Sequence, residues 1–116
     1  MPDTPKPPKT YNEFVDRYPK LGQAWELIAE AGHEGPIDMR TQRLVKLGIA
    51  VGAMREGAVH SSVRKALAMG ITPGEIEQVV ALSAGTLGLP STVAVFTWVR
   101  DYLERWKQGA GHEERG

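Results

Sequence analysis

The sequence of 116 residues contains no cysteine. This absence excludes disulfides, thiolate metal sites, iron–sulfur clusters and thiol nucleophiles. The sequence also has no run of eighteen apolar residues and no apolar stretch of the signal-peptide kind near its N-terminus. We therefore expect no membrane partner and predict a cytoplasmic protein.

The sequence likewise has no excess of charge of one sign. Its 14 Lys and Arg residues balance 14 Asp and Glu residues, and no basic run is long enough to follow a phosphate backbone. Nucleic acid is therefore not an expected partner. The three histidines have no carboxylates at ligand spacing, so we predict no metal site and no cofactor.

Clean alternation of apolar and polar residues is absent too, whereas apolar spacings of three and four recur along the chain. With 41% hydrophobic and 24% charged residues, the composition is typical of one ordinary globular domain. We predict an all-α protein, a compact bundle of about six helices over residues 11–108. The proline-rich residues 1–10 and the glycine-rich residues 109–116, with His112 in solvent, are predicted to be a disordered tail and a flexible tail.

Local signals predict where several of these helices begin and end. Proline disfavours helix in the residue before it, so the first helical region should break near Pro19. Asp38 suits a helix N-cap, and Thr72-Pro73-Gly74-Glu75 is a capping box with proline at the first helical position. These signals divide the chain into separate helices.

Two glycines lie four residues apart in the helix predicted after Asp38. Each of Gly48 and Gly52 costs about 1 kcal/mol relative to alanine unless close packing offsets it. We therefore expect another helix to cross closely at these positions. The preceding helix carries an apolar stripe that contains Trp25.

Several motifs, taken in order, resemble the carboxymuconolactone decarboxylase and alkylhydroperoxidase D-like family. They are Phe14 with Tyr18-Pro19, then Ile37–Leu44, Leu47–Ala53, Glu56–Leu67, Gly70–Ile76 and Gly88-Leu89-Pro90. The resemblance covers residues 11–106. It implies the helical fold of that family, assembled as a symmetric homo-oligomer, a dimer-based ring such as a trimer or hexamer.

The peroxidase branch of this family carries a Cys-x-x-Cys pair, a histidine and an acidic residue. The resemblance puts the two cysteine positions at Arg55 and Ala58, the histidine at Ser62 and the acid at Arg43. A thiolate must attack the peroxide and a second thiol must resolve the product. The chain is therefore predicted to lack cysteine-dependent peroxidase activity.

The decarboxylase branch needs no cysteine and carries His-x-Arg-x-Ala-Leu in the same register. This sequence keeps Arg64 and loses that histidine to Ser62, while His60 lies about 200° away around an ideal helix. If the helix runs through Gly57, Glu56 and His60 are i, i+4 partners and form a general acid/base pair. The alternative is that both residues face solvent at a helix start.

Arginines near this pair suggest a site for an anion. Arg43 and Arg55 are twelve residues apart, within about 120° of each other on an ideal helix. With Ser62 and Arg64 they are candidates for binding a small anionic, carboxylate-bearing ligand. The alternative is that these arginines pair with acids of a neighbouring subunit or face water.

Two functions follow from these residues and the resemblance. The first is a cofactor-free, decarboxylase-like lyase or isomerase that acts on a small carboxylated or lactone substrate, with His60 as general acid/base and Glu56 beside it. The second is a non-catalytic oligomeric module for ligand binding or interaction that has lost the family's peroxidase activity.

Overall fold

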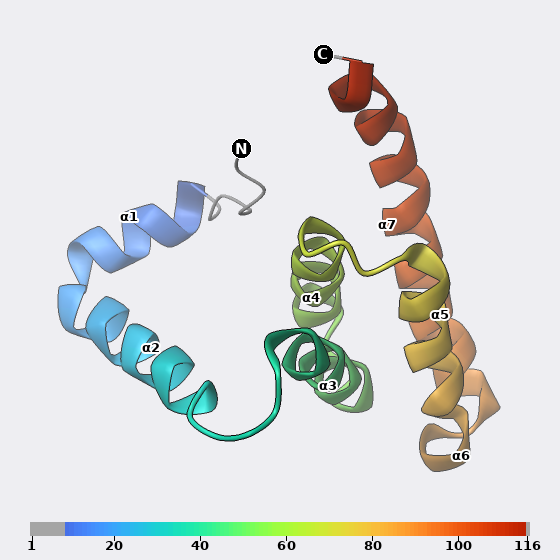
Figure 1. Ribbon diagram of the computed structural model, residues 1–116, viewed down its shortest axis with the longest axis horizontal. Helices are drawn as coiled ribbons and strands as arrows, with labels where there is room; N and C mark the ends of the chain where they lie inside the picture. The colour runs from blue at the N-terminus through green and yellow to red at the C-terminus, as the bar shows by residue number, and fades with distance from the viewer. Residues whose placement is uncertain (1–8, 116) are drawn as a thin grey trace.

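The computed structural model describes residues 9–115, and their side chains as far as residue 109. This part of the chain contains seven helices and no strand, which confirms the predicted all-α class (Figure 1). The helices are α1 (Lys9–Arg17), α2 (Pro19–Gly32), α3 (Met39–Gly52), α4 (Glu56–Ala68), α5 (Pro73–Leu82), α6 (Ala84–Leu87) and α7 (Leu89–Arg115). Residues 1–8 of the predicted N-terminal tail and the side chain of His112 lie outside the described part.

The helix boundaries follow the local signals in three places. Tyr18 separates α1 from α2, which begins at Pro19, as the proline predicts. Asp38 is the N-cap of α3 and accepts a hydrogen bond from Thr41 N at 3.1 Å. Thr72 and Glu75 form the predicted capping box at the start of α5.

The last helix is longer than the sequence indicated. It continues to Arg115, through most of the segment 109–116 that we expected to be a tail. No proline follows Pro90 to stop it, and the two glycines in this extension, Gly109 and Gly111, each cost only about 1 kcal/mol in a helix. Helix α7 thus extends past the body of the molecule (Figure 1).

One apolar core lies among α3, α4, α5 and α7. Its fully buried members include Leu47, Val59, Val63, Ile76 and Val99. Residues at the apolar spacings of three and four noted in the sequence supply this core, and the bundle consists of α3 to α7.

Helices α1 and α2 form a separate arm, shown in blue to cyan at one side of Figure 1. Val15 packs against Gly22, where an added Cβ would lie 3.2 Å from the Val15 Cβ. Neither helix has a buried residue. The stripe that contains Trp25 is therefore formed as predicted but is not covered within the described chain: the Trp25 side chain is 56% exposed.

Two features of the short linker before α3 set the direction of the arm. Gly35 has φ of +141°, in the region that favours glycine. The Gln42 side chain donates to Ile37 O at 2.6 Å, and its Oε1 lies 2.7 Å from His33 Nδ1. One side chain thus ties both ends of the linker to the first turns of α3.

Within residues 9–115, no helix combines the length and the apolar content that crossing a bilayer requires.

Candidate functional site

The candidate site depends on how the chain passes from α3 to α4. Helix α3 ends at Gly52, and Met54 adopts φ of +56° before α4 begins at Glu56. Gly57 therefore lies inside α4, as the acid/base interpretation required. Arg55 is the N-cap of α4, with extended backbone.

This turn overturns one expectation. Arg43 and Arg55 were placed about 120° apart on a single helix, but the left-handed residue Met54 breaks the helix between them. Arg43 belongs to α3 and Arg55 to the turn before α4. The helical projection consequently gives no reason for these two arginines to flank one pocket.

Glu56 and His60 do lie together on one face of α4. His60 Nε2 is 3.7 Å from Glu56 Oε2, and the two side chains are 31% and 55% exposed. This separation is too long for a direct hydrogen bond, but it is short enough for an ion pair when the imidazole is protonated. The pair is half-open to solvent, so a small molecule can reach the ring.

Helix α7 supplies a second wall beside His60. The rings of His60 and Tyr102 have their centroids 5.7 Å apart, and the Arg105 guanidinium carbon is 5.9 Å from the Tyr102 ring centroid. Burial raises the pKa of Tyr102, although the charges of Arg64 and Arg105 act in the opposite direction. The phenol is therefore a hydrogen-bond donor at neutral pH, flanked by cations.

We call Glu56, His60, Arg64, Tyr102 and Arg105 the α4/α7 cluster. The sequence did not identify Tyr102 or Arg105 as site residues. Their spacing of three on α7 puts them on one side of that helix. Nothing in the sequence, however, says that this side meets the His60 face of α4.

Two other predicted residues lie elsewhere. Ser62 is buried at 8% exposure, on the core side of α4. Arg43 Nε is buried and has no hydrogen-bond partner within the described residues, and burial lowers the pKa of this guanidinium. Burial also lowers the pKa of Lys65, helped by the charges of Arg43, Arg64 and Lys46. Arg43 therefore belongs to a basic region between α3 and α4.

A cavity of about 550 Å³ lies in a different part of the molecule, between α3 and the pair α5–α6. We call it the α3/α5 groove. Its lining includes Leu44, Val45, Gly48, Gly52, Val79, Leu82 and Leu87. None of the six residues predicted as site residues lines it.

Gly48 and Gly52, the two glycines four residues apart in α3, both line this groove. At Gly48 an added Cβ would meet Val79 Cγ1 at 3.9 Å, and at Gly52 nothing lies within 4 Å. The close helix crossing predicted at these positions does not occur within the described chain. The glycines line the groove instead.

The chemistry open to the α4/α7 cluster is proton transfer and anion binding. It joins an imidazole and a carboxylate to a phenol and two guanidinium groups. Among the described residues, no three His, Cys, Asp or Glu side chains group in a way that could hold a metal ion.

A sequence model of the carboxymuconolactone decarboxylase family matches residues 19–101, well over half of the chain. The chain belongs to this family. No curated protein and no solved structure matches it. The family match includes Glu56, His60 and Arg64, and it ends directly before Tyr102.

This member of the carboxymuconolactone decarboxylase family has no cysteine anywhere in its sequence. It therefore has no thiolate of its own, the group that attacks the peroxide in thiol-dependent peroxide reduction. Any chemistry at the α4/α7 cluster has to use oxygen and nitrogen groups.

Proposed function

We propose that the chain is a cofactor-free lyase or isomerase that acts on a small carboxylated or lactone substrate at the α4/α7 cluster. The observation that carries this proposal is the Glu56–His60 pair, with 3.7 Å between Oε2 and Nε2, beside the Tyr102 ring. It provides an accessible acid/base group, a carboxylate within ion-pair distance of it, and a neighbouring donor.

His60 has the role of general acid/base. In a decarboxylation, the bond between the carboxylate carbon and its neighbouring carbon breaks, and CO₂ leaves. The electron pair of that bond stays on the neighbouring carbon, to which the imidazolium delivers a proton. In an isomerisation, the neutral ring removes a proton from one carbon and returns it to another. Proton transfer of this kind contributes about 10²- to 10⁴-fold to rate.

Arg64 and Arg105 have the role of holding the substrate carboxylate. The positive charges of both arginines act on Tyr102, where they lower the pKa of the phenol. This phenol can donate a hydrogen bond to a developing oxyanion. We leave Ser62 out of the proposed site because it faces the core. Arg43 is left out because its Nε is buried and because its charge, unlike those of Arg64 and Arg105, does not act on Tyr102. Arg55, one residue before Glu56, lies at the edge of the proposed site.

The test is a turnover assay with muconolactone-type acids, following CO₂ release and the loss of the lactone. His60→Gln is expected to lower kcat/KM by at least about 100-fold, while Arg105→Gln raises KM. His33→Gln is the matched control, since His33 lies at the end of α2 and outside the cluster. Unchanged turnover in His60→Gln would remove this residue from the mechanism.

The second candidate is a non-catalytic oligomeric module that binds a ligand or partner. The observation that favours it is that the largely apolar α3/α5 groove is a separate surface. None of the residues of the α4/α7 cluster lines this groove. Saturable binding of small acids without any turnover, unchanged in His60→Gln, supports this candidate over the enzyme.

A further inference from the structure

Positive charge is concentrated in one part of the chain, although the total charge is balanced. Residues 39–68, which form α3, α4 and the turn between them, contain six Lys and Arg residues and a single acid, Glu56. Glu56 lies beside His60, and Arg40 bonds to Glu75 of α5. The remaining basic side chains of the two helices therefore have no acid of their own segment to pair with.

Three of these basic side chains lie near one another between α3 and α4. Arg43 and Lys46 are three residues apart and share one side of α3. Arg43 is nine residues before the end of α3 and Lys65 is nine residues after the start of α4, so both lie about 13 Å along their helices from the turn. The charges of Arg43 and Lys46 act on Lys65, as does that of Arg64. We call Arg43, Lys46 and Lys65 the α3/α4 basic region.

No carboxylate neutralises this region within the part of the chain that the structure describes. No ion pair there joins Arg43, Lys46 or Lys65 to an acid. All three residues are half-buried, and Arg43 Nε is buried without a hydrogen-bond partner. Burial lowers the pKa of both Arg43 and Lys65, because the charged form loses contact with water. Half-buried cations gathered in this way cost free energy unless an anion joins them.

A phosphoryl group has the chemistry that this region lacks. A phosphate monoester carries about 1.5 to 2 negative charges at neutral pH and three strong acceptor oxygens, whereas a carboxylate carries one charge on two oxygens. The guanidinium of Arg43 offers a planar fork for two oxygens, and the lysines offer compact positive charges. Several cations without a carboxylate are therefore better matched by a phosphoryl group than by a simple acid.

We propose that the α3/α4 basic region binds a phosphoryl group, carried either by a soluble phosphate ester or by a lipid headgroup. This site goes beyond the proposed lyase function, because Arg43, Lys46 and Lys65 all lie outside the α4/α7 cluster. The two proposals can fail separately: the lyase is tested by turnover at His60, and the phosphoryl site by binding at the basic region.

The test titrates the full chain with inorganic pyrophosphate by isothermal titration calorimetry, and with acetate as a monoanion. Wild type should bind pyrophosphate saturably and acetate at least about tenfold more weakly. Arg43→Gln and Lys65→Gln should each raise the pyrophosphate Kd by at least about tenfold, the loss expected for a hydrogen bond to a charged group. The matched controls Arg17→Gln and Lys20→Gln remove the same charges from exposed positions of the arm and should leave this Kd unchanged.

Thermal unfolding gives a second readout, which a merely structural role would not produce. The charged form of Lys65 is disfavoured in the folded protein, so Lys65→Gln should unfold at a higher temperature than wild type when no ligand is present. Pyrophosphate should raise the Tm of wild type and raise that of Lys65→Gln much less. Circular dichroism checks that each variant is folded.

Two results would overturn the proposal. Wild type that binds no pyrophosphate would indicate that acids of a neighbouring subunit neutralise the region. Equal pyrophosphate affinity in wild type, Arg43→Gln and Lys65→Gln would place the anion elsewhere on the molecule.

A further arm of the experiment distinguishes the two sources of the phosphoryl group. Phosphatidylcholine vesicles with and without phosphatidic acid are sedimented with the protein. Sedimentation that requires phosphatidic acid and is lost in Arg43→Gln supports the site with a lipid headgroup as its ligand. Saturable pyrophosphate binding without such sedimentation supports it with a soluble phosphate ester as its ligand.

Discussion

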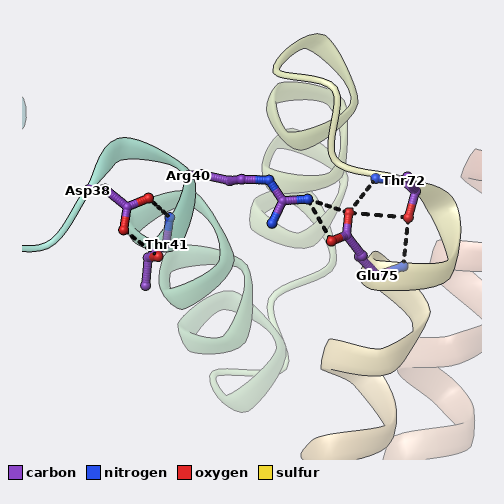
Figure 2. A network of polar contacts seen from close by, with 5 residues as sticks. All are labelled: Asp38, Arg40, Thr41, Thr72 and Glu75. Atoms are coloured by element: carbon purple, nitrogen blue, oxygen red, sulfur yellow. Dashed lines mark hydrogen bonds and ion pairs between the residues drawn. The ribbon is translucent and has the colours of Figure 1, made fainter.

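Arg40 Nη2 donates to both carboxylate oxygens of Glu75, at 2.6 and 2.5 Å, and so joins the first turn of α3 to the first turn of α5 (Figure 2). The same carboxylate accepts from Thr72 N at 2.9 Å and closes the capping box. Glu75 therefore fixes the start of α5 and its position against α3. It also lies at the edge of the α3/α5 groove.

Acid should weaken this junction. The bond from Arg40, followed by that from Thr72 N, lowers the pKa of Glu75 from 4.5 to about 2. A depressed carboxyl pKa stabilises the fold above the unfolded-state value, and this contribution is lost as pH falls toward the folded-state value. Thermal unfolding between pH 5 and pH 2 should therefore change less with pH in Glu75→Gln than in wild type.

The matched control for that series is Glu77→Gln, an exposed position on the same helix. It should retain the wild-type pH dependence. Equal slopes in wild type and Glu75→Gln would show that the Arg40–Glu75 bond does not stabilise the fold.

The hydroxyl of Thr72 should contribute more to the free energy of unfolding than its methyl group does. It accepts from Glu75 N at 3.1 Å, which satisfies an amide that has no partner inside the helix. Thr72→Ala should lower the free energy of unfolding by about 1 kcal/mol, and Thr72→Ser should preserve most of it. Urea denaturation of the two variants measures the difference, and equal losses would contradict a capping role.

Truncation in the core should be far more damaging than truncation on the surface. Leu47 is fully buried and Leu89 is 68% exposed. Leu47→Ala should lower the free energy of unfolding by about 2–5 kcal/mol, because a cavity is left behind, whereas Leu89→Ala should change it by no more than about 0.5 kcal/mol. Comparable losses in urea denaturation would argue against the core assigned to α3, α4, α5 and α7.

Peroxide should not be consumed by this protein. The sequence has no cysteine, so neither the attacking thiolate nor the resolving thiol exists. A peroxide assay with dithiol reductant should give the same rate for native protein and for heat-denatured protein. A higher rate for the native protein would require a peroxidase chemistry without sulfur.

The sequence predicted the local structure well where one residue decides it. Pro19 divides α1 from α2, and the Thr72–Glu75 box starts α5, because proline and capping residues act on their own backbone. The spacing of Glu56 and His60 was equally local, and both residues share one face of α4.

Relations between helices were harder to predict. The projection of Arg43 and Arg55 on one helix was wrong because the helix ends before Met54, which has a positive φ. Methionine rarely adopts this conformation, so the residue type did not indicate the break. Tyr102 was missed because its contact with His60 depends on how α7 packs against α4. The glycine pair in α3 predicted a closely crossing helix, but within the described chain both glycines line an open groove.

The most direct test of the central claim, that small acids bind at the α4/α7 cluster, is a nuclear magnetic resonance titration with a carboxylated lactone. The three histidine rings are followed by their Cε1–Hε1 signals, and His60→Gln assigns the one that matters. Binding at the cluster predicts a saturable shift of the His60 signal and a Kd raised at least about tenfold in Arg105→Gln. An unmoved His60 signal, with shifts confined to the methyl groups of Val45 and Leu82 in the groove, would contradict it.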